Sequence, residues 1–592
     1  MGMAVMLPLI ASGLLWSGIL FAHRRLLTYI ATAGLLAQAW WMLITVFVNS
    51  FWPYLVVPSS VYIGGCLVPL MVGVFFWKFW RFPLFSGYKG MPDLFVILVL
   101  MIAGGFAYGI SLFNGPQADH AFIFHGFYNG DTATFISLVQ KAMVGSSTNP
   151  FGAGVPLEYP TLLHQSFASV LDLVGFGLDW IFYLPTLTLI WLLLCVPMFF
   201  LFCDELLPEL QDRKWLAHVG QALAILYVMA LSWDAYAYPQ SHFFLMGLFL
   251  FLATVLYKAV KEVTGRMYAL GSLGIGIAIL LLMANAVTGT AAIACTLMFL
   301  FYVAQDNKRA LAQRGVALGF LALLASLFFV LAPGEPQFGG LQFSYSAVPD
   351  MLMLAPVLVL AGVAGLMYLS RSPMPIFFFA GLSGLALVTF FFSNREIIIA
   401  NAVRFFYHAI VVVFPLILLV LVRIFYLLRR ELVFTTHTLV EKISGFGMLG
   451  ISLVLLALPA LTSVASATDN LLFKDEKRIS GAMLEAAWSV ADHTDKDAII
   501  LATPYSPWAV PILTGRSLVR AAYEDGSAYW LSANDDVLAT QIAAFAGDKA
   551  AQQEIVKHAD YLLLDTAERI VWEPLPYKKT FDNGETVIYD LP

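Results

Sequence analysis

The chain has 592 residues, of which 60% are hydrophobic and only 12% are charged, and its mean hydropathy is +0.82. This composition excludes an ordinary water-soluble globular protein and indicates a chain whose main solvent is lipid. The net charge of −6 and the lack of any basic block argue against nucleic acid as a partner. A polar backbone can cross hydrocarbon only if its hydrogen bonds close internally, so the long apolar runs predict a polytopic α-helical membrane protein.

Apolar runs of roughly 20 residues, the length that crosses a bilayer, recur along the chain. We expect about fourteen transmembrane helices, at about 4–22, 26–48, 55–77, 92–113, 180–203, 216–233, 242–257, 267–285, 288–304, 315–332, 350–370, 374–393, 402–422 and 443–465. The first run lacks a positive flank and a small-residue cleavage site, which predicts a retained span and not a signal peptide. All four cysteines fall in apolar runs, so we expect buried thiols: Cys66, Cys195, Cys203 and Cys295.

Lysine and arginine are distributed very unevenly over the loops between these spans. One set of alternate loops holds eighteen of them: Arg24, Arg25, Lys78, Arg81, Lys89, Arg213, Lys214, Lys258, Lys261, Arg266, Lys308, Arg309, Arg314, Arg371, Arg423, Arg429, Arg430 and Lys442. The opposite set holds only Lys141, Arg395 and Arg404. Because cytoplasmic loops carry the excess of Lys and Arg, the second set is predicted to be extracytoplasmic, and it includes residues 114–179 and 466–592.

From about Ser466 the composition becomes that of a soluble protein. The stretch "LFKDEKRISGAMLEAAWSVADHTDKD" predicts a helix, and the runs "AIILATP", "ADYLLLD" and "ETVIYDL" predict strands. Alternating helix and strand signals are typical of a small α/β domain. We therefore expect a transmembrane domain over 1–465 and a soluble extracytoplasmic α/β domain over 466–592, which lacks a glycine fingerprint and favours a cap or acceptor-binding role.

The long loop 114–179 contains "FHGFYNGDTATFISLVQKAM", with one carboxylate, Asp131, at its centre. The segment after it places apolar side chains on one face, which predicts an amphipathic helix on the membrane surface: Phe135, Leu138, Val139, Ala142 and Met143. Residues 161–174 have a similar pattern, with His164 expected on the polar face. Asp131 stands at the start of the first helix, where it is suited either to capping the helix or to acting as a general base.

Further polar candidates lie in the loops of the same predicted side. Acids stand at Asp119 and at Glu158, which precedes Tyr159 in "PLEYPTLLHQ", while "SWDAYAYPQSH" holds Asp234 and His242. The stretch "NREIIIANAVRFFYH" holds Arg395, Glu396, Arg404 and His408. A charge at the membrane boundary is costly unless it reaches the polar interface or has a partner, and the planar fork of an arginine fits a phosphate. An outward-facing acid together with Arg404 predicts a reaction on a lipid-linked phosphate.

At "NGDTATF", "YPTLLH" and "NAVRFFYH" the chain resembles the GT-C superfamily of integral-membrane glycosyltransferases, and "PYSPWAVPILTGR" and "FDNGETVIYDL" are similar to their extracytoplasmic C-terminal domains. The resemblance implies transfer of a sugar, with inversion, from a polyprenyl-phosphate donor to a glycan, lipid or protein acceptor at the outer face of the plasma membrane. It implies a general base in Asp131, a phosphate ligand in Arg404, and a hydroxyl- or metal-positioning acid in Asp234 or Glu158. The remaining candidates for substrate binding are His408, Arg395, Glu396, Tyr159, His242 and Asp119.

The chain departs from the family pattern in two respects. Three predicted spans precede the long loop, and no second acid stands beside Asp131, so the sequence assigns no cofactor and leaves a divalent cation open. Two alternatives stay open: another lipid-phosphate-dependent envelope enzyme such as a ligase or polymerase, and a fourteen-helix transporter or lipid flippase. Transporters are often built from internal repeats, and this sequence has no clear repeat between its halves.

Overall fold

A computed structural model describes most of the chain. The described residues are 2–21, 25–51, 59–80, 93–112, 115–116, 122–124, 130–145, 149–155, 161–207, 215–231, 241–262, 264–304, 357–359, 374–392, 404–417, 447, 454, 457–462, 464–465, 477–503, 509–521, 536–572 and 575–592. Within them, six helices are long and apolar enough to cross a membrane. The chain is therefore a helical protein of the membrane type.

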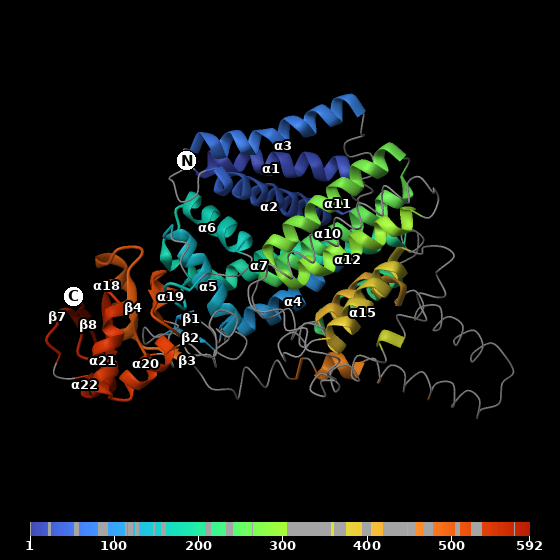
Figure 1. The fold of residues 1–592 in the computed structure, drawn as a ribbon. Helices are drawn as coiled ribbons and strands as arrows, with labels where there is room; N and C mark the ends of the chain where they lie inside the picture. The colour runs from blue at the N-terminus through green and yellow to red at the C-terminus, as the bar shows by residue number, and fades with distance from the viewer. Residues whose placement is uncertain are drawn as a thin grey trace.

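Apolar helices form a bundle that makes up most of the molecule (Figure 1). They are α1 (Gly2–Leu20), α2 (Leu26–Phe51), α3 (Ser59–Trp80), α4 (Leu94–Leu112), α7 (Leu184–Leu206), α8 (Trp215–Leu231), α10 (Ser241–Lys261), α11 (Thr264–Ala284), α12 (Ala286–Ala304), α15 (Met374–Phe392) and an unlabelled helix Arg404–Ile417. These coincide with eleven predicted spans. The predicted spans at 315–332, 350–370 and 443–465 lie wholly or mostly outside the described residues, so the total of fourteen stays a prediction.

Burial follows the position of each helix in the bundle. The central helix α10 is almost completely enclosed, with Phe249, Phe251 and Leu252 fully buried. On the outer helices, by contrast, large apolar side chains such as Met71 of α3 and Met101 of α4 are 62% and 69% exposed. Water would penalise that exposure, whereas hydrocarbon does not, because lipid tails are as apolar as these side chains. All four cysteines are free and buried, as the apolar context predicts.

The two ends of the bundle are distinguished by where the helices start and stop. The Tyr257 hydroxyl of α10 donates to the Leu206 carbonyl of α7 at 3.4 Å, and Lys258 donates to the Leu20 carbonyl at the end of α1. The ends of α1, α7 and α10 therefore lie together, and we call this the distal end. The opposite end, where α7 and α10 begin, is the proximal end.

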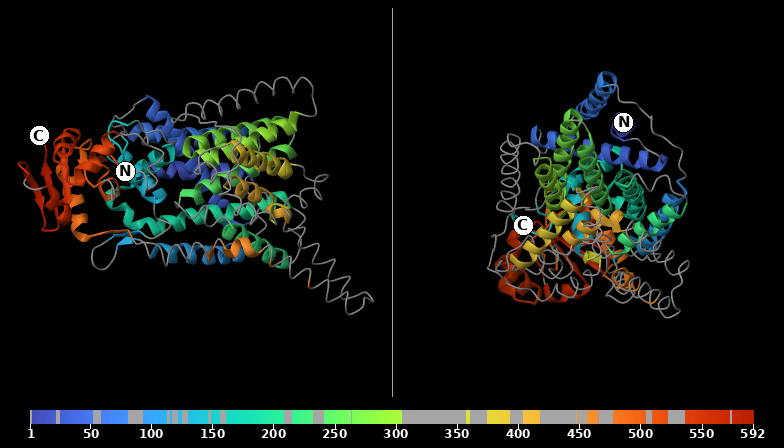
Figure 2. Two further views of the ribbon diagram at one scale, coloured as in Figure 1. Left: turned by 60° about the horizontal axis from the view of Figure 1, so that its bottom comes forward. Right: turned by 90° about the vertical axis from the view of Figure 1, so that its right-hand side faces the viewer.

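In the described part of the C-terminal region, residues 477–592, a mixed sheet and five α-helices lie beside the proximal end of the bundle (Figure 2). The strand order is β5 (Ser517–Leu518), β4 (Ile499–Leu501), β6 (Tyr561–Asp565), β8 (Thr586–Asp590) and β7 (Lys578–Asp582). Strand β4 is parallel to β5 and β6, and β8 is antiparallel to its neighbours. The helices are α18 (Gly481–His493), α19 (Ala509–Thr514), α20 (Asp536–Phe545), α21 (Lys549–Ile555) and α22 (Thr566–Trp572).

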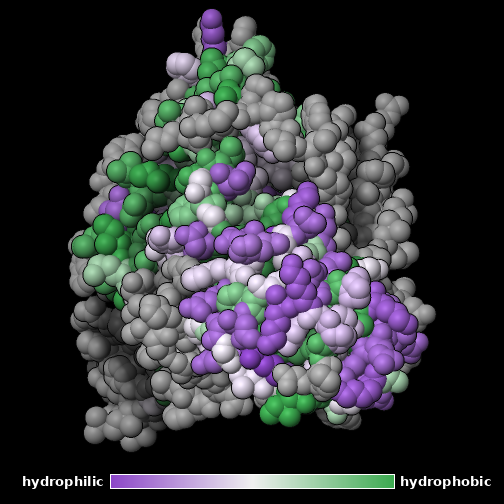
Figure 3. Space-filling model, turned by 90° about the vertical axis from the view of Figure 1, so that its left-hand side faces the viewer, coloured by the Kyte–Doolittle hydropathy of each residue, from purple (hydrophilic) through white to green (hydrophobic). Residues whose placement is uncertain are grey.

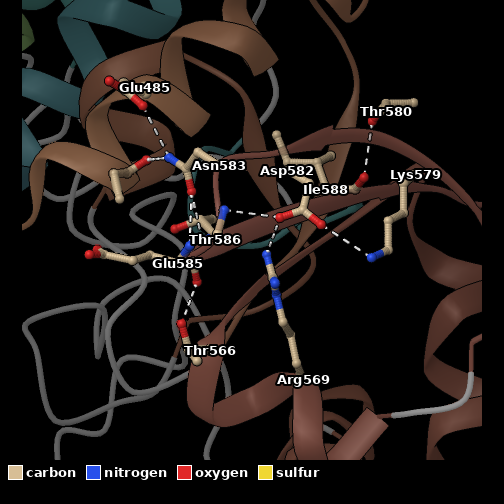
Figure 4. Close-up of polar contacts among 12 residues, drawn as sticks. Glu485, Thr566, Arg569, Lys579, Thr580, Asp582, Asn583, Glu585, Thr586 and Ile588 are labelled. Atoms are coloured by element: carbon tan, nitrogen blue, oxygen red, sulfur yellow. Dashed lines mark hydrogen bonds and ion pairs between the residues drawn. The ribbon is translucent and has the colours of Figure 1, made fainter.

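The surface of the C-terminal region differs from that of the bundle. Hydrophilic residues gather over it, while hydrophobic residues dominate the flank of the helices (Figure 3). Its β7–β8 turn is held by side chains: Asp582 accepts from Arg569 at 2.8 Å and from Lys579 at 3.1 Å, and Asn583 donates to Glu485 at 3.2 Å (Figure 4). These are the contacts of a surface that faces water.

A second sheet ties the long loop 114–179 to the C-terminal region. Its strands, in order, are β1 (Gly115–Pro116), β2 (Phe122–Phe124) and β3 (Lys477–Ile479), and Phe122 lies opposite Ile479. Strand β3 falls within the stretch predicted to be helical, whose described helix begins only at Gly481 after the N-cap Ser480. Pairing with β2 outweighs the local helix signal there. Because hydrogen-bonded strands share one compartment, the long loop and the C-terminal region lie on the same side of the bundle.

Candidate functional site

Asp131 is the second residue of α5 (Gly130–Met143), within its first turn. Helix α5 packs against α6 (Leu162–Val174) through aromatic contacts, in which the Phe135 ring lies 5.0 Å from the His164 ring and 6.0 Å from the Phe167 ring. A carboxylate in the first turn complements the positive end of the helix dipole, and this placement is compatible with a capping role and with a base. The backbone position of Asp131 therefore depends on how α5 is held.

Helix α5 differs from the surface helix expected from its sequence. All residues from Phe135 to Lys141 are buried, including the polar Gln140 and Lys141. His164, expected on a polar face, is only 4% exposed. The C-terminal region covers the side of α5 that a lone amphipathic helix would present to water, and the His164 ring packs against Phe135 of α5.

Gln140 is the centre of the polar contacts that hold the end of α5. Its Nε2 donates to the Leu178 carbonyl at 2.7 Å and to the Ile512 carbonyl of α19 at 2.9 Å. Its Oε1 accepts from the Trp180 indole at 3.1 Å. One side chain therefore joins α5, the turn before α7 and the C-terminal region.

Lys141 is buried next to Gln140, and its Nζ donates to the Ser517 hydroxyl at 2.8 Å. Desolvation lowers the pKa of the Lys141 ammonium to about 8; the Asp497 charge opposes this shift and the Arg516 charge adds to it. Sequence reasoning counted Lys141 only as a loop charge. The sequence did hold one sign that Lys141 is important: few basic residues stand in the loops on the predicted extracytoplasmic side.

Arg404 and His408 lie on the helix Arg404–Ile417, where Arg404 is partly exposed and His408 is 1% exposed. His408 Nδ1 lies 2.8 Å from the Arg404 carbonyl oxygen, and its ring stands edge-on to Phe249 of α10 at 4.8 Å. Further along, Phe414 contacts Phe199 in the second half of α7 at 5.7 Å. The helix therefore runs from the proximal toward the distal end, and Arg404 stands on its proximal side.

The structure thus assigns four of the predicted site residues to the proximal half of the molecule. Asp131 is on α5, Arg404 and His408 are on the helix Arg404–Ile417, and His242 is the second residue of α10. Six others lie outside the described residues: Asp119, Glu158, Tyr159, Asp234, Arg395 and Glu396. Among the described residues, no group of three or more His, Cys, Asp or Glu side chains could hold a metal ion.

A buried polar cluster at the distal end was not anticipated from the sequence. We call it the basal cluster: Arg25, Asp204, His218 and Gln221. Arg25, 1% exposed, forms an ion pair with Asp204, lies 3.3 Å from His218 Nδ1 and donates to Gln221 Oε1 at 3.3 Å. Asp204, an acid near the end of an apolar run, was the available signal, because such charges need partners.

The geometry of the basal cluster indicates a structural role, in which one side chain links several helices. Arg25 joins α2, α7 and α8, and its guanidinium lies 5.1 Å from the centre of the Phe200 ring. Its terminal nitrogens contact Asp204, His218 and Gln221, whereas its buried Nε has no hydrogen-bond partner. The cluster therefore fastens helices at the end remote from α5 and the C-terminal region.

Comparison with known proteins adds no assignment: no protein-family model matches the chain, and a search of curated proteins gave no match.

Proposed function

We propose that the chain is a membrane glycosyltransferase that moves a sugar from a polyprenyl-phosphate donor to an acceptor of the cell envelope, and that it acts at its proximal end. One observation carries this proposal. The first turn of α5 with Asp131, the Arg404 end of the helix Arg404–Ile417 and the water-facing C-terminal region all belong to the same end of the bundle. A lipid-linked phosphate sits at such a boundary, with its tail in hydrocarbon and its sugar in water.

The proposed reaction is a single displacement with inversion. The acceptor hydroxyl gives its proton to the Asp131 carboxylate while its oxygen forms a bond to the anomeric carbon of the donor. The bond from that carbon to the phosphate oxygen breaks, and the electron pair leaves with the lipid phosphate. Arg404 stabilises the leaving phosphate through paired N–H donors, which match two phosphate oxygens.

The surroundings of Arg404 suit this role. Its backbone carbonyl holds the His408 ring at 2.8 Å, and that ring is packed against Phe249. This part of the helix is thus anchored in the bundle while the Arg404 side chain is partly exposed. We infer that the C-terminal region is an extracytoplasmic α/β domain of a GT-C-type enzyme in the plasma membrane, and that it faces the acceptor.

Reconstitution tests the proposal. The purified protein is placed in liposomes with radiolabelled polyprenyl-phosphate sugars, including arabinose and mannose donors, and with envelope glycan fragments as acceptors. We expect transfer of label from lipid to acceptor with at least one donor. Movement of labelled lipid between leaflets without any transfer would contradict the proposal and favour a flippase.

A further inference from the structure

The loop "TGRS", residues 514–517, is held unusually firmly for a connection between a helix and a strand. The Thr514 hydroxyl donates to the Val510 carbonyl at 2.6 Å and accepts from the Arg516 amide at 3.0 Å. Arg516, 5% exposed, donates to the carbonyls of Thr514, Ala491 and Thr494, each at 2.9 Å. The loop is therefore a rigid part of the C-terminal region.

Gly515, in the middle of this loop, meets the backbone of α5. A Cβ at Gly515 would lie 2.8 Å from the Gln140 carbonyl oxygen and 3.0 Å from its carbonyl carbon. Its φ of +65° is also in the left-handed region, which side chains rarely adopt. Only glycine lets the loop come this close, so Gly515 sets how near α5 approaches the C-terminal region.

Residues on both sides of Gly515 also hold the end of α5 in place through hydrogen bonds. Ser517 accepts the Lys141 hydrogen bond at 2.8 Å, and the Ile512 carbonyl accepts from Gln140 at 2.9 Å. Residues 150–153 add backbone hydrogen bonds beside β5, where the Leu518 amide donates to the Pro150 carbonyl at 2.9 Å. The end of α5 is thus held against a rigid surface from several directions.

We propose that Gly515 and Ser517 are positioning residues for the reaction at the proximal end: they fix the end of α5, and through this stiff helix they set the place of Asp131 in its first turn. This inference rests on the proposed function of Asp131. A helix transmits a shift at one end to the other, and a displacement of about 1 Å in a reacting group can cost roughly 100-fold in rate. The C-terminal region would then control the rate and not only cover the membrane domain.

Gly515→Ala tests the proposal by pushing α5 away without removing any hydrogen bond. Its matched control is Gly584→Ala, because Gly584 is also left-handed, with φ of +92°, but has no atom within 4 Å of the added Cβ. Ser517→Ala is a milder variant that removes only the hydroxyl that Lys141 contacts. Each protein is studied as the full chain in liposomes, by hydrogen exchange of the α5 amides and by transfer kinetics.

For Gly515→Ala we expect faster exchange of the α5 amides and a kcat lowered roughly 10- to 100-fold, with an unchanged KM for the lipid donor. Gly584→Ala should match the wild type in both measurements, and Ser517→Ala should show smaller changes in the same direction. If Gly515→Ala does not fold, the exchange and kcat of Ser517→Ala alone decide whether the loop positions α5.

Unchanged exchange, or faster exchange with normal kcat, would overturn the positioning role. If the wild type itself transfers no sugar, the proposed function fails, while the exchange data still report whether the loop holds α5.

Discussion

At the scale of single residues, the burial of Lys141 leads to a specific prediction for how stability depends on pH. Its ammonium has a pKa of about 8 in the folded protein because of burial, whereas a free lysine titrates near 10.4. Between these two values the unfolded chain binds more protons than the folded one. The free energy of unfolding should therefore gain about 1.4 kcal/mol per pH unit from this group as pH rises over that window, and nothing from it below about pH 8.

Lys141→Met removes the titrating group while keeping most of the stem. We expect the difference in melting temperature between wild type and Lys141→Met, measured in detergent from pH 7 to pH 10, to change in favour of the wild type above about pH 8. Other groups titrate in the same range, so only the difference between the two proteins isolates Lys141. Parallel pH profiles would show that its charge is not desolvated.

Arg404 makes a second prediction at this scale. Lysine keeps the positive charge but lacks the planar fork, so Arg404→Lys should raise the KM for the lipid donor roughly tenfold or more, the cost of losing about one charge-assisted hydrogen bond. An unchanged melting temperature would confirm that the variant folds. Normal donor KM and turnover would remove Arg404 from the phosphate site and make Arg395 the better candidate.

At the scale of elements, the helices of the bundle could be predicted well because each one is a continuous apolar run, and hydrophobicity over about 20 residues is a strong signal. Helix α5 shows what hydrophobicity alone cannot predict, namely which part of the chain covers a helix. Its apolar face is plain in the sequence, but the covering of Gln140 and Lys141 depends on Ile512 and Ser517, about 370 residues later. A pattern within one helix cannot show what packs on its polar side.

The proposed site could be derived from the sequence only in part, for a related reason. Asp131 and Arg404 could be selected because charges are scarce in this chain, and scarcity is visible in a sequence. The role of Gly515 was not, because it arises from a distance to the Gln140 backbone. The basal cluster was also missed, since the pairing of Arg25 with Asp204 joins helices far apart in the chain.

The basal cluster provides a prediction for helix packing. Arg25→Met leaves the Asp204 carboxylate largely buried without its partner and should destabilise the protein by about 3–5 kcal/mol, whereas Arg25→Met with Asp204→Leu should cost considerably less. Glu262→Gln, which breaks the more exposed Arg266–Glu262 pair at 3.6 Å, is the control and should cost under about 1 kcal/mol. Denaturant unfolding in mixed micelles gives these values. Equal losses for the single and double variants would contradict a coupled pair.

At the scale of the whole molecule, the orientation in the membrane can be tested by cysteine labelling. The four native cysteines are buried and free, so an added cysteine reports its own position. The excess of Lys and Arg on alternate loops predicts that Glu554→Cys, in the C-terminal region, reacts with an impermeant maleimide in intact cells. Glu262→Cys, at the distal end, should react only after permeabilisation. The reverse pattern would invert the orientation and place the proposed site in the cytoplasm.

The central claim is that Asp131 is a base and not only a helix cap, and these roles respond differently to asparagine. Asparagine caps a helix almost as well as aspartate but cannot take a proton from the acceptor. We therefore compare the sugar-transfer rates of Asp131→Asn and Asp119→Asn with that of the wild type, in the same liposomes and with saturating donor. The account predicts a folded Asp131→Asn protein whose rate falls by roughly 100-fold or more, a larger loss than for Asp119→Asn. A wild-type rate for Asp131→Asn would contradict it.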